Sequence, residues 1–154
     1  MTVAGLLDKA RRAGVRIATA ESCTGGMVAV ALTDVPGSSD VVECGFVTYS
    51  NDAKIELLDV SPESLSRLGA VSEAVAREMA EGALRQSHAQ LSVAITGIAG
   101  PGGSERKPEG RVCFGLARRG HPTRTETRDF GAPGRGRVRE LARDHALALL
   151  DAAL

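Results

Sequence analysis

Residues that could carry chemistry gather where an apolar run ends near residue 20. Residues 15–20 are typical of a strand, and positions 21–26 read Glu-Ser-Cys-Thr-Gly-Gly before apolar residues resume. Glycines let the backbone approach a ligand closely, and free N–H groups at the start of a helix attract an anion or a developing oxyanion. The pattern predicts a strand, a reactive turn and a helix, with Ser22, Thr24 and Gly25 as candidate site residues.

Ser22 has two interpretations. A serine before a helix is most often an N-cap, whereas a nucleophilic serine needs a base within reach. His88 stands at a predicted helix end, His121 in a turn and His145 on the last helix, so a Ser-His-Asp triad is disfavoured.

Lys54 is the remaining candidate base. It follows a predicted strand at 43–49, and its amine could reach Ser22 if that strand neighbours the strand at 15–20. A lysine becomes a base when desolvation lowers its pKa. The alternative interpretation, a solvated surface lysine, is the commoner role for this residue type.

A glycine-rich stretch and an arginine cluster offer binding groups. Positions 96–103 read Thr-Gly-Ile-Ala-Gly-Pro-Gly-Gly after a short apolar run, and loops at strand ends are where open α/β sheets bind ligands. We therefore expect Thr96, Gly97 and Gly100 to form a second wall of the same pocket. No Lys-Ser or Lys-Thr follows the last glycine, so a nucleotide-triphosphate P-loop is unlikely. One arginine of positions 135, 137, 139 and 143 could clamp a phosphate, while the others would be solvated.

The order of elements defines the expected fold. Strands are predicted at 15–20, 41–49, 91–95, 111–118 and 122–130, and helices in the first dozen residues, at 27–33, around Lys54, from Pro62, at 72–87 and at 136–153. Early alternation of strand and helix followed by a late hairpin predicts a three-layer α/β/α sandwich with a mixed, mostly parallel sheet. A length of 154 residues suits one domain spanning 1–154.

Composition narrows the function classes. Nineteen basic residues balance nineteen acidic ones and aromatic residues make up 3% of the chain, so nucleic acid is an unlikely partner. Three scattered cysteines, at 23, 44 and 113, indicate neither a disulfide framework nor a zinc site. No apolar run approaches the ~20 residues that span a bilayer, so we expect a cytoplasmic protein with no membrane partner. A small, alanine-rich helical surface favours a homo-oligomer.

Six motifs together resemble the C-terminal domain family of the competence/damage-inducible protein CinA. In chain order they are Thr-Ala-Glu-Ser-Cys-Thr-Gly-Gly at 19–26, Pro-Gly-Ser-Ser at 36–39, Gly-Phe-Val-Thr-Tyr-Ser-Asn at 45–51 with Lys54, Gly-Ala-Val-Ser at 69–72, Thr-Gly-Ile-Ala-Gly-Pro-Gly at 96–102 and Lys-Pro-Glu-Gly at 107–110. The family includes nicotinamide-mononucleotide deamidases. The resemblance implies hydrolysis of a small-molecule nucleotide, nicotinamide mononucleotide, to the acid and ammonia, with no metal and no cofactor.

The resemblance also implies roles for individual residues. Ser22 would be the nucleophile and Lys54 its general base, while Tyr49, Ser39 and Thr96 would line the pocket and assist proton transfer or substrate contact. Arg135 would hold the phosphate, with Arg137 as a competitor for that role. Backbone donors between Cys23 and Gly25 would stabilise the oxyanion. Two alternatives stay open: a non-catalytic module that binds a nucleotide or phosphate, and a competence factor that acts on DNA.

Overall fold

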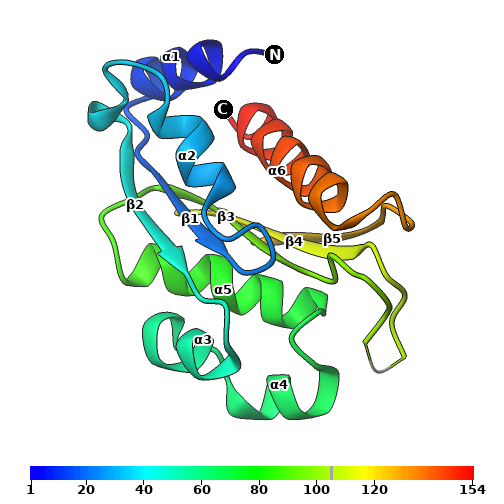
Figure 1. Ribbon diagram of the computed structural model, residues 1–154. Helices are drawn as coiled ribbons and strands as arrows, with labels where there is room; N and C mark the ends of the chain where they lie inside the picture. Colours follow the sequence, from blue (N-terminus) through cyan, green and yellow to red (C-terminus); the bar gives the residue numbers. More distant parts are fainter. Residues whose placement is uncertain (105) are drawn as a thin grey trace.

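A mixed five-stranded sheet forms the middle layer of the computed structural model, which describes residues 1–104 and 106–154 (Figure 1). The strands lie in the order β2-β1-β3-β4-β5, with bounds β1 Ile17–Glu21, β2 Val42–Val47, β3 Leu91–Gly97, β4 Arg111–Arg118 and β5 Arg124–Asp129. Strand β1 pairs in parallel with both β2 and β3, whereas β4 is antiparallel to β3 and β5. The predicted mixed sheet, parallel at its centre and with a terminal hairpin, is confirmed.

Helices cover both faces of this sheet, which confirms the predicted three-layer sandwich (Figure 1). One face carries α1 (Val3–Ala13), α2 (Met27–Thr33) and α6 (Arg135–Ala152), and the other carries α3 (Asn51–Leu58), α4 (Pro62–Leu68) and α5 (Glu73–Arg85). A separate apolar cluster fills the space on each side of the sheet. Within the described ranges, no helix is both long enough and apolar enough to cross a bilayer.

Serine or threonine side chains cap the N-termini of four helices. Thr2, Ser50, Ser61 and Ser72 each accept a hydrogen bond from a backbone N–H in the first turn of α1, α3, α4 and α5 respectively. Capping of this kind stabilises a helix by about 1 kcal/mol. The Ser50 cap sets where the helix bearing Lys54 begins.

Several strand ends differ from the sequence-based expectation by one or two residues, and two of these differences have a clear local reason. Strand β1 begins at Ile17, because the Val15 N–H donates to the carbonyl of Ala10 and so belongs to the end of α1. Strand β2 ends at Val47, because the carbonyls of the next two residues accept hydrogen bonds from a lysine side chain. The second departure marks the functional site.

Glycine at position 82 allows α5 to pack closely against α3. A Cβ at Gly82 would lie 2.1 Å from the Leu58 carbonyl oxygen, whereas a Cβ at Gly136, in α6, would meet nothing within 4 Å. Backbone cannot yield as a flexible side chain can, so the Gly82 contact fixes the distance between the two helices.

We expect Gly82→Ala to lower the free energy of unfolding by about 1–3 kcal/mol or more, the usual cost of overpacking. Gly136→Ala, the matched control, should be neutral or stabilise by less than about 1 kcal/mol through helix propensity. Urea denaturation followed by circular dichroism measures both. Equal effects of the two substitutions would contradict the proposed role of Gly82.

Candidate active site

The turn after β1 presents Ser22 at the edge of the sheet where the parallel strands end. The Ser22 N–H donates to the Ile95 carbonyl of β3 at 2.9 Å, and the Gly25 N–H donates to the Ser22 carbonyl at 3.0 Å. Gly25 and Gly26 have φ values of +58° and +108°, in the region that favours glycine. The N-cap of α2 is Gly26, which caps with no side chain. The N-cap interpretation of Ser22 is therefore wrong, and its hydroxyl is available for another contact.

The start of α2 is occupied by the buried carboxylate of Glu21. Its Oε1 accepts from the Val28 N–H at 2.9 Å and from the Thr24 hydroxyl at 2.6 Å, and its Oε2 accepts from the Ala29 N–H at 3.1 Å. Glu21 and Thr24 are both 0% exposed. The expectation that these helix amides serve an external anion is thus wrong. The Thr24 hydroxyl also serves the fold, and Thr24 does not line the pocket.

Lys54 lies against Ser22 and is 1% exposed, so the surface interpretation of this lysine is wrong. Its Nζ is 3.0 Å from Ser22 Oγ, 2.8 Å from the Thr48 carbonyl oxygen and 3.3 Å from the Tyr49 carbonyl oxygen. The neighbouring strands β1 and β2 and the short helix α3 bring these groups together, as expected from the sequence.

Burial lowers the pKa of Lys54 from its usual 10.5 to about 8. A neutral amine has two N–H bonds and one lone pair. Because the carbonyls of Thr48 and Tyr49 can only accept, they take the two N–H bonds and leave the lone pair for the Ser22 hydroxyl. The geometry therefore allows the amine to receive the proton of a serine that attacks a substrate.

Cys23, the other potential nucleophile in the turn, is not activated. It is 5% exposed and belongs to the apolar cluster beneath α2 and α6. Burial raises the pKa of its thiol to about 12, so the reactive thiolate is scarce at neutral pH. Its backbone N–H, in contrast, forms no hydrogen bond to another residue in the part of the chain that the structure describes, and Cys23 lies beside Ser22 on the pocket wall.

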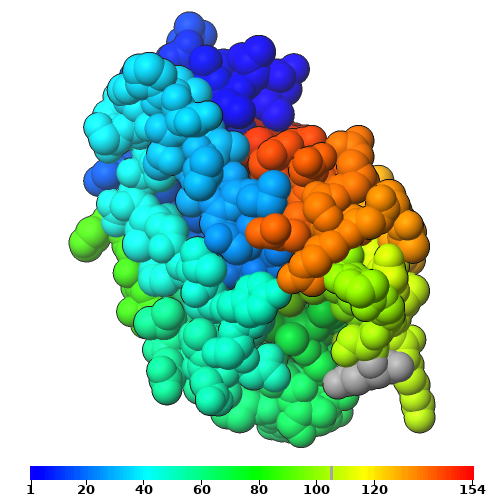
Figure 2. All heavy atoms as spheres, in the orientation of Figure 1, coloured from blue at the N-terminus to red at the C-terminus, as the bar shows by residue number. Residues whose placement is uncertain are grey.

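A cavity of about 380 Å³ surrounds the Ser22–Lys54 pair. Its walls come from the turn after β1, the segment after β2, the glycine loop and the start of α6; the residues are Ser22, Cys23, Tyr49, Asn51, Lys54, Ala70, Val71, Thr96, Gly97, Ile98, Ala99, Gly100, Pro101, Gly102, Gly103, Ser104 and Arg135. Figure 2 shows the start of α6, the segment after β2 and the glycine loop meeting on this face. The arrangement is a concave site that contains a serine hydroxyl in contact with a buried lysine amine.

A larger cavity of about 630 Å³ lies at the opposite end of the sheet, between β4, β5 and the end of α6. Its walls include His121, Glu126 and Phe114, but among the described residues that line it there is no serine, cysteine or lysine. His145 contacts Glu126 and packs edge-on against Phe114, with ring centroids 4.6 Å apart. We therefore assign the chemistry to the smaller cavity.

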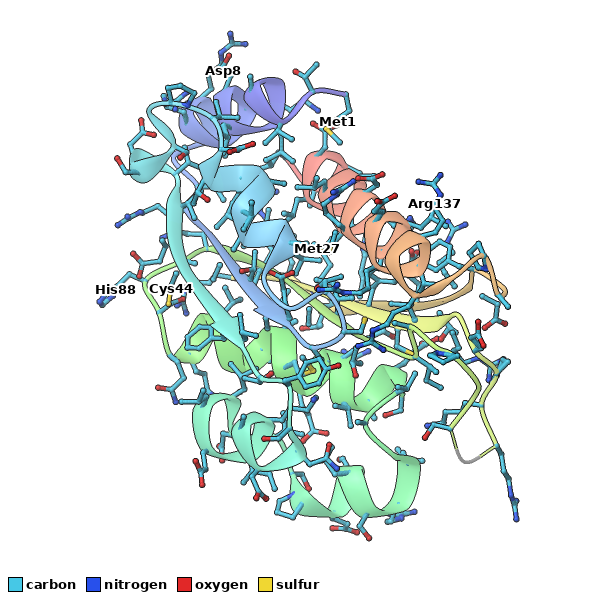
Figure 3. All side chains as sticks on the ribbon, in the orientation of Figure 1. Met1, Asp8, Met27, Cys44, His88 and Arg137 are labelled. Carbon is cyan, nitrogen blue, oxygen red and sulfur yellow. The ribbon has the colours of Figure 1, made fainter. Side chains whose placement is uncertain are left out.

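Arg135 spans the mouth of the active-site cavity. Its Nη1 donates to the Gly100 carbonyl at 2.8 Å and its Nη2 to the Tyr49 hydroxyl at 2.9 Å. Both acceptors are neutral, and Arg135 meets no carboxylate within residues 1–104 and 106–154. Its positive charge is thus available to an anion. Arg137 is outside the cavity: it pairs with Glu140 at 3.2 Å and points away from the sheet (Figure 3).

The remaining candidate residues divide between the pocket and the scaffold. Gly97 and Gly100 line the cavity as expected. Thr96 also lies on its wall, but its hydroxyl donates to the Ala70 carbonyl at 2.8 Å and so supports the opposite wall. Gly25 lies outside the cavity wall. Ser39 is exposed in a short 3-10 turn that precedes β2, at the other end of the strand, so its expected place in the pocket is wrong.

Tyr49 contributes in two different ways. Its backbone carbonyl accepts from Lys54, whereas its side chain is 61% exposed and its hydroxyl bonds to Arg135 at the cavity mouth. Tyr49 lines the cavity as expected, and its expected help in proton transfer stays a prediction.

Two basic residues have contacts that sequence reasoning did not assign. Lys107 Nζ donates to the carbonyls of Leu68 and Val71, both at 2.5 Å, and so ties the 107–110 motif to the pocket wall. Arg139 Nε donates to the Cys23 carbonyl at 3.0 Å. The sequence signal for Lys107 is its place in the 107–110 motif, to which no role is assigned. The signal for Arg139 is its place in the arginine cluster, whose members the sequence pattern alone does not distinguish.

Comparison with known proteins places the chain in a family. The CinA C-terminal domain family model matches residues 2–154, and the chain belongs to this family. A CinA-like protein of Mycolicibacterium paratuberculosis is 54% identical over 142 residues, covering 90% of this chain and 33% of that protein. A CinA-like protein of Chlorobium phaeobacteroides is 58% identical over 124 residues, covering 79% and 30% respectively. The chain thus spans about a third of the length of these relatives.

Solved structures of the same family share the fold. The competence/damage inducible protein CihA from Agrobacterium tumefaciens matches with a TM-score of 0.94 and 44% identity, covering 97% of this chain and 92% of that one. A CinA superfamily protein from Escherichia coli matches with a TM-score of 0.91 and 40% identity, covering 98% and 90%. These matches span almost the whole of both chains.

The buried amine of Lys54 predicts a pH-dependent stability. Because its pKa is lower in the folded than in the unfolded state, the unfolded chain binds more protons between about pH 8 and 10.5, and this group's contribution to stability rises with pH across that window. We expect Lys54→Met to be more stable than the wild type at pH 7 and the difference to shrink by on the order of 2 kcal/mol by pH 9.5. Urea denaturation at each pH measures it; a constant difference would contradict a depressed pKa.

Proposed function

We propose that this protein is a nicotinamide-nucleotide amidase that hydrolyses nicotinamide mononucleotide to nicotinic acid mononucleotide and ammonia. The observation that carries the proposal is the 3.0 Å contact between Ser22 Oγ and the buried Lys54 Nζ inside the cavity. Membership of the CinA C-terminal domain family supports it.

In the first half of the reaction, Lys54 Nζ takes the proton of Ser22 as Oγ attacks the carbonyl carbon of the nicotinamide amide. The C=O carbon becomes a tetrahedral centre that bears an oxyanion, and the proposed donor to this oxyanion is the N–H of Cys23, a pocket-wall residue next to Ser22. One such donor is typically worth ~3 kcal/mol in the transition state. The protonated lysine then gives its proton to the departing nitrogen, ammonia leaves, and an ester joins Ser22 to the nicotinoyl group.

In the second half, Lys54 acts as base for water. The amine, neutral again, takes a proton from a water molecule whose oxygen attacks the ester carbon. Collapse of the second tetrahedral intermediate breaks the bond to Ser22 Oγ, which regains the proton from Lys54. The products are the free carboxylic acid and the starting enzyme, so atoms and charges balance.

Arg135 binds the phosphate of the nucleotide in this proposal. Its guanidinium lies at the mouth of the cavity and, among the residues that the structure describes, is held by the Tyr49 hydroxyl and the Gly100 carbonyl, both neutral groups that a phosphate can displace. A planar guanidinium can contact two phosphate oxygens at once.

We expect Ser22→Ala to abolish ammonia release from nicotinamide mononucleotide while binding of the nucleotide persists. Ser66→Ala, an exposed serine on α4, serves as the control and should match the wild type. Ammonia release measured by a coupled assay and binding measured by calorimetry separate the two properties. Undiminished turnover in the Ser22→Ala variant would contradict the proposed serine mechanism.

We expect kcat/KM of the wild type to rise with pH and level off above about pH 8, since only the neutral amine of Lys54 can accept the proton. Initial rates between pH 6 and 9.5 measure the profile. A profile that falls over the same range would contradict a lysine base.

Replacing Arg135 by Met should raise KM for the mononucleotide roughly ten- to hundredfold, the effect of losing one charge-assisted contact to phosphate. Arg137→Met should leave KM within about twofold, because Arg137 pairs with Glu140 outside the cavity. Steady-state kinetics of the two variants decide between the arginines. A larger effect at Arg137 would reverse the assignment.

A non-catalytic module that binds a nucleotide phosphate is the second candidate. The free charge of Arg135 favours this alternative, since it attracts an anion whether or not the serine reacts. Binding of nicotinamide mononucleotide by the wild-type protein without any release of ammonia would select it.

A further inference from the structure

The guanidinium of Arg139 lies across the turn that carries the nucleophile. Its Nε donates to the Cys23 carbonyl at 3.0 Å, and its Nη2 is close enough to Gly25 that a Cβ there would approach it to 3.3 Å. Gly25 therefore provides both the positive φ of the turn and the space for this side chain.

Other contacts hold the turn on either side of Cys23 but leave its carbonyl to Arg139. Ser22 is anchored by its N–H on Ile95, and Thr24 is anchored by its hydroxyl on Glu21. In the part of the chain that the structure describes, the Cys23 carbonyl accepts from no group other than Arg139. This hydrogen bond, which we call the Arg139 brace, joins Cys23, the residue after Ser22, to the long outer helix α6.

Arg139 does not line the cavity, unlike Arg135 one helical turn earlier. The two side chains leave the same face of α6, at positions i and i+4, and have different partners. Arg135 meets the mouth of the cavity, and Arg139 meets the backbone behind the reactive hydroxyl. Arg135 can therefore contact a substrate in the cavity, whereas Arg139 can affect the reaction only through the turn.

We propose that Arg139 is a positioning residue that holds the Ser22–Cys23 backbone in the geometry needed for attack and for oxyanion binding. The effect on the reaction rests on the proposed amidase function. Misplacement of a reacting group by 1 Å can cost about a hundredfold in rate. Because Arg135 still binds the phosphate, loss of the brace should lower kcat and leave KM nearly unchanged.

The test compares three substitutions on α6. We expect Arg139→Met to lower kcat for ammonia release roughly ten- to hundredfold with KM within about twofold. Arg139→Lys, which keeps a cationic donor, should recover part of the loss. Arg143→Met is the matched control, since Arg143 pairs with Asp144 at 2.9 Å further along the helix, and it should match the wild type. A kcat of Arg139→Met within twofold of the wild type would overturn the proposal, as would an equal loss in Arg143→Met.

A second measurement does not depend on turnover. The amides of Gly25 and Met27 are hydrogen-bonded within the turn, to the carbonyls of Ser22 and Thr24, and should exchange with deuterium faster in Arg139→Met than in the wild type or Arg143→Met. Unchanged exchange would overturn the brace even if the amidase function holds. If instead the wild type releases no ammonia while exchange responds as expected, the proposed function fails and the brace stands.

Discussion

The site depends on a lysine amine that is removed from water. Lys54 is covered by protein on nearly all sides, so its charged form is destabilised and its pKa is lowered toward neutrality. Two backbone carbonyls from the end of β2 then fix the direction of its remaining lone pair, toward Ser22. A surface lysine at the same distance would stay protonated and could only donate.

Much of the framework could be predicted from sequence because its signals are local. Apolar runs, serine caps and glycine turns each lie within a few residues of the element they define, and strand pairing follows from alternation of strand and helix. The neighbouring positions of β1 and β2 also placed Ser22 and Lys54 within reach. Local sequence patterns leave the roles of Ser22 and Lys54 open, and the resemblance to the family identifies them as the expected nucleophile and base.

The remaining details depend on contacts between distant residues. Glu21 falls within the predicted reactive turn, yet its carboxylate accepts hydrogen bonds from two N–H groups at the start of α2. No local pattern distinguishes this role of Glu21 from a capping role for Ser22. Arg135, Arg137 and Arg139 are equivalent in sequence, but a helix turns about 100° per residue, so Arg137 leaves a different face of α6 from the other two. Arg135 and Arg139 share a face and differ because one reaches the Gly100 carbonyl and the other the Cys23 carbonyl. Ser39 belongs to one of the six family motifs, but it precedes β2 and so lies at the end of the sheet opposite the cavity.

The proposed nucleophile and base are attached to opposite layers of the sandwich. Ser22 precedes Cys23, which packs into the apolar cluster under α2 and α6, while Lys54 is on α3, whose Leu58 packs into the cluster on the other face of the sheet. The distance between Ser22 Oγ and Lys54 Nζ therefore depends on how the two helical layers are positioned on either side of the sheet. Substitutions in either apolar cluster can therefore change this distance without changing a residue that lines the cavity.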